Sequence, residues 1–228
     1  TDLSDILDRR IFGVISIAPA GAGIFKVLEP GAEEPVNGGE AIDCVIVTSH
    51  PMNIRWGTAF GERGSGDPPV CRSVDGVEGI DEGGEVHACA DCPYNRFGED
   101  GQRKACTNKR QLYVFRAGDL FPMLFALPPS GLRAFDNYRV GTRLTVRQPM
   151  HAIVTRISLA QKRNDAGVAY SAPVFTPVGL LPQDGALQVK AYVESIVNSV
   201  KKAGIFADAL TGAASAQAEP ADDTARPA

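Results

Sequence analysis

The chain has 228 residues, of which 44% are apolar and 22% are charged, a composition typical of a globular protein that buries a core. Its longest apolar runs are too short to cross a bilayer, and no basic segment followed by an apolar run opens the chain. We therefore expect no membrane partner, no secretory signal and a cytoplasmic location.

Charge is distributed unevenly along the chain. The net charge is −4, which by itself argues against nucleic-acid binding. However, residues 96–163 carry 13 basic and 4 acidic groups, whereas residues 1–95 carry 6 and 16, and residues 164–228 carry 4 and 7. A basic middle segment between acidic flanks indicates a surface that meets a negatively charged partner.

Short apolar runs rich in Val, Ile and Phe predict three strands near the start, at residues 10–18, 23–30 and 41–49. Cys44 lies in the third run and is predicted to be a core residue. Residues 61–85 are rich in glycine and nearly free of aliphatic side chains. Such a long loop inside a compact domain needs something other than a hydrophobic core to order it.

The second half of the chain predicts a hairpin at residues 110–128, a short helix at 129–141, and a strand pair at 143–161 and 168–181. Ser130 is the expected N-cap of the short helix. Gly141 is its expected stop.

Residues 187–204 predict the clearest helix, because Leu187, Ala191, Ile196 and Val200 fall roughly on one face and two lysines occupy the last turn. The following segment, residues 205–228, is rich in Ala, Pro and Asp and is predicted to be a disordered tail. The fold class is therefore mostly β with a C-terminal helix.

Four of the five cysteines predict a zinc site. Cys71, Cys89, Cys92 and Cys106 form the pattern C-x17-C-x2-C-x13-C. Two thiolates spaced C-x2-C can occupy adjacent corners of a zinc tetrahedron, and four thiolates leave no open position for a substrate. We expect one structural Zn²⁺, whose binding energy orders a zinc-ribbon insertion at residues 61–106.

Three alternatives to this ligand set stay open. His87 could replace Cys71 as the fourth ligand. A thioredoxin-like redox pair is disfavoured because the C-x2-C lies outside a βαβ setting. Structural disulfides are disfavoured by the odd cysteine count and the expected reducing compartment.

Basic and aromatic residues alternate through and beyond the last zinc ligand. The candidate nucleic-acid contacts are Arg96, Arg103, Lys104, Lys109, Arg110, Arg139, Arg143, Arg147 and Arg156, with Tyr94, Phe97, Tyr113 and Trp56 as stacking residues. Cations that follow a phosphate backbone and aromatic rings that stack on bases are typical of single-stranded nucleic-acid binding. The competing interpretation is that many of these rings lie in a β core.

The chain resembles a family of hypothetical proteins of phages and integrative elements. The resemblance rests on DPPVCRSVDG (67–76), CADCPYNRFG (89–98), KACTNKRQLY (104–113) and FPMLFALPPSGL (121–132). It implies a mobile-element origin and a bacterial host cell.

The proposed organisation is also similar to that of the helix-destabilising single-strand-binding proteins of T-even phages. That similarity implies an OB-like barrel, here formed by residues 1–60 and 107–186 and interrupted by the zinc ribbon at 61–106. The segment AEPADDTARPA departs from the acidic, apolar-tipped tails of bacterial single-strand-binding proteins.

The sequence predicts a single-stranded DNA-binding protein that tolerates sequence changes and acts in DNA replication or recombination, with proteins of those processes as further partners. The alternative is an interaction module whose basic face binds an acidic host or assembly partner. We predict no enzymatic activity, since no catalytic motif occurs; an enzyme would need Asp119, Asp136 and His151 to converge.

Overall fold

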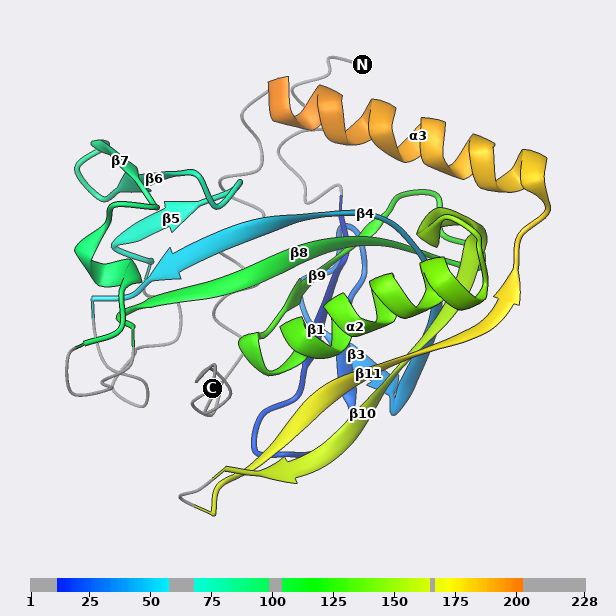
Figure 1. Cartoon of the computed structure of the whole chain (residues 1–228), viewed down its shortest axis with the longest axis horizontal. Coiled ribbons are helices and arrows are strands. Elements are labelled where there is room, and N and C mark those ends of the chain that lie inside the picture. The colour runs from blue at the N-terminus through cyan, green and yellow to red at the C-terminus, as the bar shows by residue number, and fades with distance from the viewer. Residues whose placement is uncertain (1–11, 58–67, 99–103, 165–166, 203–228) are drawn as a thin grey trace.

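The computed structural model describes residues 12–57, 68–98, 104–164 and 167–202, and it is mostly β (Figure 1). The strands are β1 (Val14–Ile17), β2 (Phe25–Leu28), β3 (Val36–Gly39), β4 (Ala41–Arg55), β5 (Cys71–Ser73), β6 (Glu78–Asp81), β7 (Val86–Ala88), β8 (Cys106–Arg116), β9 (Met123–Leu127), β10 (Ile153–Arg163) and β11 (Ala169–Leu180). The helical elements are α2 (Pro129–Thr145), α3 (Gln183–Lys202) and the short 3-10 turns η1 (Pro93–Asn95) and η2 (Met150–Ala152).

All eleven strands belong to one sheet, in which β4 and β8 are the central pair. The order is β3-β2-β1-β9-β8-β4-β5-β6-β7, and β10 joins β4 to β11. β1 and β9 pair in parallel, and the other pairings are antiparallel. The edge of β4 opposite β8 pairs with two different strands, because residues 41–45 pair with β10 and residues 53–55 pair with β5. The β4–β8 pair therefore carries β5, β6 and β7 at one end.

The sheet curves around one main core. Its buried residues come from six strands and α2, and include Ile15, Phe25, Cys44, Leu112, Val114, Phe125, Phe135 and Ile157. Two hydrogen bonds bring the β1–β2 loop against the β10–β11 hairpin: Ser171 Oγ accepts from Gly23 N, and Gln161 Nε2 donates to Gly21 O. The sheet is nevertheless open by its strand pairings, so the predicted OB-like barrel is not confirmed.

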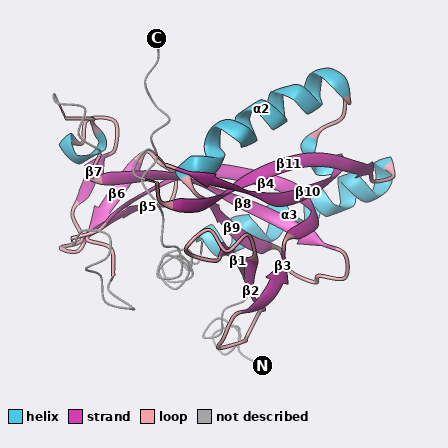
Figure 2. Cartoon of the chain, turned by 90° about the horizontal axis from the view of Figure 1, so that it is seen from below, coloured by secondary structure: helices cyan, strands magenta, loops and turns pink. Residues whose placement is uncertain are grey.

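The two long helices lie on different sides of the sheet (Figure 2). Phe135 and Tyr138 of α2 pack against Phe175 of β11 on the side of the main core. Val193 of α3 packs against Phe12 and strand residues on the opposite face. No helix among the described residues has both the length and the apolar character needed to cross a membrane.

The predicted strands at residues 10–18 and 23–30 contain β1 and β2. The predicted strand at 41–49 matches only the first part of β4, and the hairpin at 110–128 contains β9 and most of β8. Cys44 is buried, as predicted, and burial raises the pKa of its thiol to about 12. The helix predicted at residues 187–204 corresponds to α3. The predicted tail at residues 205–228 lies outside the described residues.

The predicted start of α2 at residue 129 was right, but its predicted N-cap and its predicted end were wrong. The helix begins after Pro128, with proline as its first residue, and Ser130 makes no capping hydrogen bond. It also continues through Gly141 to Thr145, so the strand predicted from residue 143 starts only at Ile153. Burial of a large side chain contributes about 1.5–3 kcal/mol, which exceeds the roughly 1 kcal/mol that a mid-helix glycine costs. Packing of Phe135 and Tyr138 thus holds the helix beyond the glycine.

The predicted apolar stripe of α3 was wrong at Leu187 and Ala191, which are exposed, whereas Ile196 and Val200 lie outside the described side chains. Leu187 is 56% exposed, whereas Ala186 and Val193 are buried. A residue step rotates a helix by about 100°, so the buried stripe is displaced by about one residue from the predicted stripe. The position of Phe12 and the strand residues beneath α3 decides which stripe is buried.

Candidate functional site

The lobe is a small projection at one end of the β4–β8 pair, formed by residues 68–98 and 104–108 (left in Figure 1). Its strands β5, β6 and β7 are three or four residues long. None of the aliphatic or aromatic side chains between residues 68 and 98 is buried, and Val77, Val86 and Ile80 are 64%, 61% and 48% exposed. Hydrophobic burial therefore cannot account for the order of the lobe.

The four cysteines of the predicted zinc site line one pocket in the lobe. Cys71 begins β5, Cys89 and Cys92 lie between β7 and η1, and Cys106 begins β8. All four are free thiols, and the pocket has a volume of about 20 Å³. A cavity of this size holds about one water-sized sphere, so it suits a single metal ion.

Hydrogen bonds fix the C-x2-C turn and tie it to the sheet. Asn95 donates from its backbone N to Cys92 O (3.0 Å) and from Nδ2 to Cys89 O (2.9 Å). Asn108 of β8 donates from Nδ2 to Asn95 Oδ1 (2.9 Å) and to Asn53 Oδ1 of β4 (2.6 Å). The cysteine turn is therefore anchored to both central strands.

Gly79 of β6 lies against the thiols. A Cβ at this position would meet Cys71 Sγ at 3.0 Å and Cys89 Sγ at 3.6 Å. The first distance is shorter than ordinary van der Waals contact, so any larger residue would push into the thiol pocket. Glycine at position 79 thus leaves room for the sulfur atoms of Cys71 and Cys89 in the pocket.

The pocket raises the pKa of its thiols. Burial, together with the neighbouring thiols of Cys89, Cys92 and Cys71, raises the pKa of Cys106 to about 12. Burial and the neighbouring thiols Cys89 and Cys92 likewise raise the pKa of Cys71. A bound divalent cation has the opposite effect and favours the deprotonated thiolates, because it stabilises their negative charge directly. Four thiols that disfavour one another as anions fit the donor set of zinc.

Among the described residues, the side chains whose ligand atoms already lie close enough to hold a metal ion belong to a different group from the four cysteines. Ligand atoms of Asp81, Glu85 and His87 all lie within 4.8 Å of one another. His87 Nε2 lies 2.8 Å from Asp81 Oδ2, and this contact lowers the pKa of Asp81. Asp81 Oδ1 also accepts from the backbone N of Gly83 and Glu85 at 2.9 Å. Asp81 is thus already engaged in closing the β6–β7 turn.

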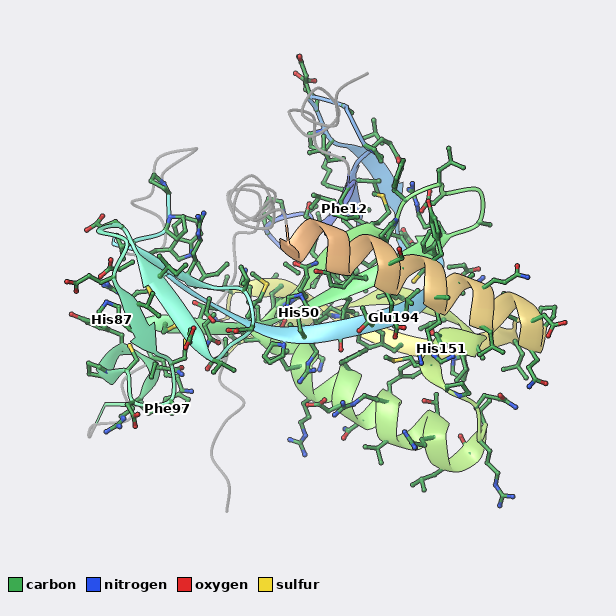
Figure 3. The ribbon with its side chains drawn as sticks, turned by 90° about the horizontal axis from the view of Figure 1, so that it is seen from above. Phe12, His50, His87, Phe97, His151 and Glu194 are labelled. Carbon is green, nitrogen blue, oxygen red and sulfur yellow. The ribbon has the colours of Figure 1, made fainter. Side chains whose placement is uncertain are left out.

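His87 also lines the thiol pocket, so its predicted role as an alternative fourth ligand is spatially accessible. Its Nε2 contacts Asp81, whereas Cys71 is close enough to Cys106 to contribute to the raised pKa of the Cys106 thiol. The contacts therefore favour Cys71 over His87 as the fourth member of the set. Figure 3 shows His87 in the lobe, on the same projection as Phe97.

Two exposed aromatic rings of the lobe each lie beside a cation. Tyr94 is 50% exposed, and the Arg55 guanidinium carbon lies 4.1 Å from its ring centroid. Phe97 is 56% exposed, with Lys104 Nζ 4.9 Å from its ring centroid. Both distances are within the range of cation–π contacts. Nearby, the Arg96 side chain is 65% exposed and reaches Asp91 only at 3.9 Å.

Other candidates of the predicted nucleic-acid surface lie in the interior. Tyr113 is fully buried and its hydroxyl contacts His50 Nε2 at 3.0 Å, so it cannot stack on a base. Lys109 is only 6% exposed and cannot meet a phosphate. Strand β8 alternates its side chains between two covered faces, and this places both residues inside.

Trp56 and Arg110 are half-buried. Trp56 packs against Met52 and Ile54. Arg110 lies near the ring of Phe135, with the guanidinium carbon 5.9 Å from its centroid. Neither residue shares the exposed aromatic surface of the lobe. Arg103 lies outside the described residues.

The remaining arginines lie away from the lobe. Arg139 and Arg143 are on α2, Arg147 follows it, and all three are exposed. Arg156 of β10 forms a two-pronged ion pair with Asp43, at 2.7 Å for both contacts. In Figure 1 α2 leads from the middle of the molecule towards the end opposite the lobe. The predicted basic surface is thus divided into two.

Sequence reasoning missed the involvement of Arg55, which precedes the basic segment by 41 positions (Arg55 against Arg96) and carries no motif. It also did not single out Asp81, although the acidic residues and His87 around a Gly-Gly turn were a usable signal. The three residues of the enzyme hypothesis have separate surroundings: Asp119 binds Arg116, Asp136 binds Arg139, and His151 lies near Lys190 and Glu194 of α3 (Figure 3).

No family model, no curated protein and no solved structure matches the chain.

Proposed function

We propose that the protein binds single-stranded DNA through the lobe, with little preference for sequence. The observation that carries this proposal is the pair of exposed rings, Tyr94 and Phe97, each with a cation beside it. A ring that is half exposed can stack on a base of any identity, and each such stack contributes about 1–3 kcal/mol. Arg55 and Lys104 stand close enough to the rings to meet the phosphates of the same strand.

We also propose that Cys71, Cys89, Cys92 and Cys106 hold one structural Zn²⁺. The shared pocket, the crowding at Gly79 and the lack of buried aliphatic or aromatic side chains between residues 68 and 98 support this assignment. Bound zinc supplies the folding energy that the lobe lacks. Its part in function is positional, because it fixes the turn that carries Tyr94 and Phe97.

From the resemblance to proteins of phages and integrative elements, we further propose that this activity serves DNA replication or recombination. A protein that binds single strands without reading sequence protects or remodels DNA during either process. The resemblance is carried by the segments that form the lobe and the hairpin after it.

The binding proposal is tested by fluorescence anisotropy with a fluorescein-labelled oligo-dT at about 50 and about 200 mM salt. We expect clear affinity at low salt that falls steeply at high salt and is similar for a mixed-sequence oligonucleotide. The double variant Y94A/F97A should bind about tenfold or more weakly. The control is F121A, which removes a 38% exposed ring outside the lobe.

Two outcomes would overturn the binding proposal. One is the absence of an anisotropy change with the wild type at low salt. The other is equal affinity of Y94A/F97A and F121A for oligo-dT, which would show that the rings of the lobe take no part.

The zinc proposal is tested by metal analysis of the purified protein. We expect about one equivalent of zinc in the wild type and its loss in C92S, because three thiolates and a hydroxyl bind zinc poorly. C44A is the matched control, since Cys44 lies in the main core and outside the thiol pocket. H87A should keep the ion; loss of zinc in H87A with retention in C92S would assign the ion to Asp81, Glu85 and His87 instead.

A further inference from the structure

We propose that the outer face of α2 docks an acidic protein segment that carries bulky apolar side chains. This face comprises Arg139, Val140, Arg143, Leu144 and Arg147. It lies apart from the lobe, and the proposal does not rest on the binding of DNA. It therefore defines a second interaction surface of the molecule.

Exposed aliphatic side chains are the first observation. Val140 is 56% exposed and Leu144 is 71% exposed, and neither belongs to a hydrophobic core. Residues four positions apart are neighbours on a helix surface, so the two side chains form one continuous apolar row. In Figure 3 side chains of α2 extend outward, away from the sheet.

Arginines flank this apolar row. Arg139 and Arg143 are also four positions apart and form a parallel row. Arg147, a third exposed cation, follows two residues after the helix end. Within the described part of the chain, neither Arg143 nor Arg147 has an ion-pair partner, and Arg139 meets only Asp136, at 3.3 Å with both side chains about half exposed. Such a pair is weak, so the row is available to external anions.

The helix dipole by itself does not explain this arrangement. Cations near the C-terminal end of a helix are favoured by the dipole, and Arg143 lies in the last turn of α2. The dipole gives no reason for Leu144, a large aliphatic side chain in the same turn that is 71% exposed. A partner that buries Leu144 while pairing with the arginines accounts for both features.

The chemistry of the face favours an acidic peptide over a nucleic acid. Base stacking needs an aromatic ring, and the exposed large apolar residues of α2 are the aliphatic Val140 and Leu144. Aliphatic side chains bury well against Leu or Phe of a peptide, whose neighbouring carboxylates can pair with guanidinium groups. The described exposed rings that lie beside cations, Tyr94 and Phe97, are in the lobe instead.

The test uses a fluorescein-labelled dodecapeptide in which Asp and Glu alternate with Leu and Phe, and a second peptide in which Ser replaces Leu and Phe. Binding is followed by anisotropy with the full-length protein. We expect the apolar acidic peptide to bind and the Ser peptide to bind at least fivefold more weakly. V140A/L144A should lose at least fivefold in affinity for the first peptide, and R143Q/R147Q should lose affinity together with most of the salt dependence.

The matched controls are Lys162→Gln, an exposed cation at the end of β10, and Val174→Ala, a 40% exposed aliphatic residue of β11. Both should bind the peptide like the wild type. Val→Ala and Leu→Ala raise or keep helix propensity, so V140A/L144A should fold, which circular dichroism and thermal melting verify.

Three results would overturn the proposal. Equal peptide affinity of the α2 variants and the controls would show that this face takes no part in peptide binding. A loss of oligo-dT affinity in R143Q/R147Q without any peptide binding by the wild type would assign the face to nucleic acid. If light scattering shows a dimer for the wild type and a monomer for V140A/L144A, and the wild type does not bind the peptide, the face would be assigned to a second copy of the chain. We expect Y94A/F97A to lose affinity for oligo-dT and to bind the peptide like the wild type, so the two proposals are separable.

Discussion

Single residues around the thiol pocket decide whether the lobe can bind metal. The spacing of Cys71, Cys89, Cys92 and Cys106 was sufficient to predict that they belong together, because the C-x2-C turn has few other uses outside a βαβ setting. Gly79 was not predicted, since its role depends on β6 pairing with β5 and bringing the glycine against two sulfur atoms.

Gly79→Ala should weaken zinc binding. The new Cβ would lie 3.0 Å from Cys71 Sγ, and overpacking of this kind costs about 1–3 kcal/mol, or roughly 5- to 150-fold in affinity. Competition with a chromogenic zinc chelator measures the change. Gly83→Ala is the control in the same lobe, because its Cβ would meet Asp81 Oδ1 at 3.3 Å and no thiol. Weaker zinc binding in Gly83→Ala alone would place the ion at Asp81, Glu85 and His87.

The aromatic candidates show why residue roles could not all be read from sequence. Tyr94 and Tyr113 have the same side chain and basic neighbours, yet one is 50% exposed and the other is fully buried. Tyr94 lies in a turn of the lobe, whereas Tyr113 lies on a central strand that is covered on both faces. Strand alternation predicts that neighbours point to opposite faces, but it does not say which faces remain open.

Secondary-structure elements were predicted where an apolar run determines them locally. The strands β1, β2, β4 and β9 are apolar over most of their length, and β8 contains the apolar run 112–115. The end of α2 was misplaced because Gly141 was read as a stop, whereas packing against β11 and β8 extends the helix for another turn. The local signal was real but weaker than the tertiary contact.

Two glycines of α2 should respond to alanine with opposite signs. A Cβ at Gly141 meets nothing within 4 Å, so Gly141→Ala should stabilise the protein by about 0.5–1 kcal/mol through helix propensity. A Cβ at Gly131 would lie 2.6 Å from Leu127 Cδ1 and 3.1 Å from Pro173 Cγ, so Gly131→Ala should destabilise it by about 1–3 kcal/mol. Urea denaturation measures both; a destabilising Gly141→Ala would show that α2 does not continue through residue 141.

At the scale of the molecule, the mostly β class was predictable and the arrangement of the strands was not. The parallel contact of β1 with β9 and the division of the β4 edge between β10 and β5 join segments far apart in sequence. Such pairings leave no local pattern. The same long-range arrangement divides the basic segment, because it sends the lobe residues to one end of the sheet and the arginines of α2 away from it.

Removal of zinc should unfold the lobe and leave the main core intact. The aliphatic and aromatic side chains between residues 68 and 98 are not buried, whereas the main core is built from fully buried residues such as Phe25, Leu112 and Phe135. Under the proposed zinc assignment, metal binding stabilises the lobe, whereas apolar burial stabilises the core. After treatment with a chelator, amide hydrogen exchange should accelerate in β5, β6 and β7 and stay slow in β1, β9 and the first half of β4. Affinity for oligo-dT should fall in parallel, because Tyr94 and Phe97 lose their positions, and it should return when zinc is restored. Unchanged exchange in the lobe after complete removal of zinc would show that the ion is not structural.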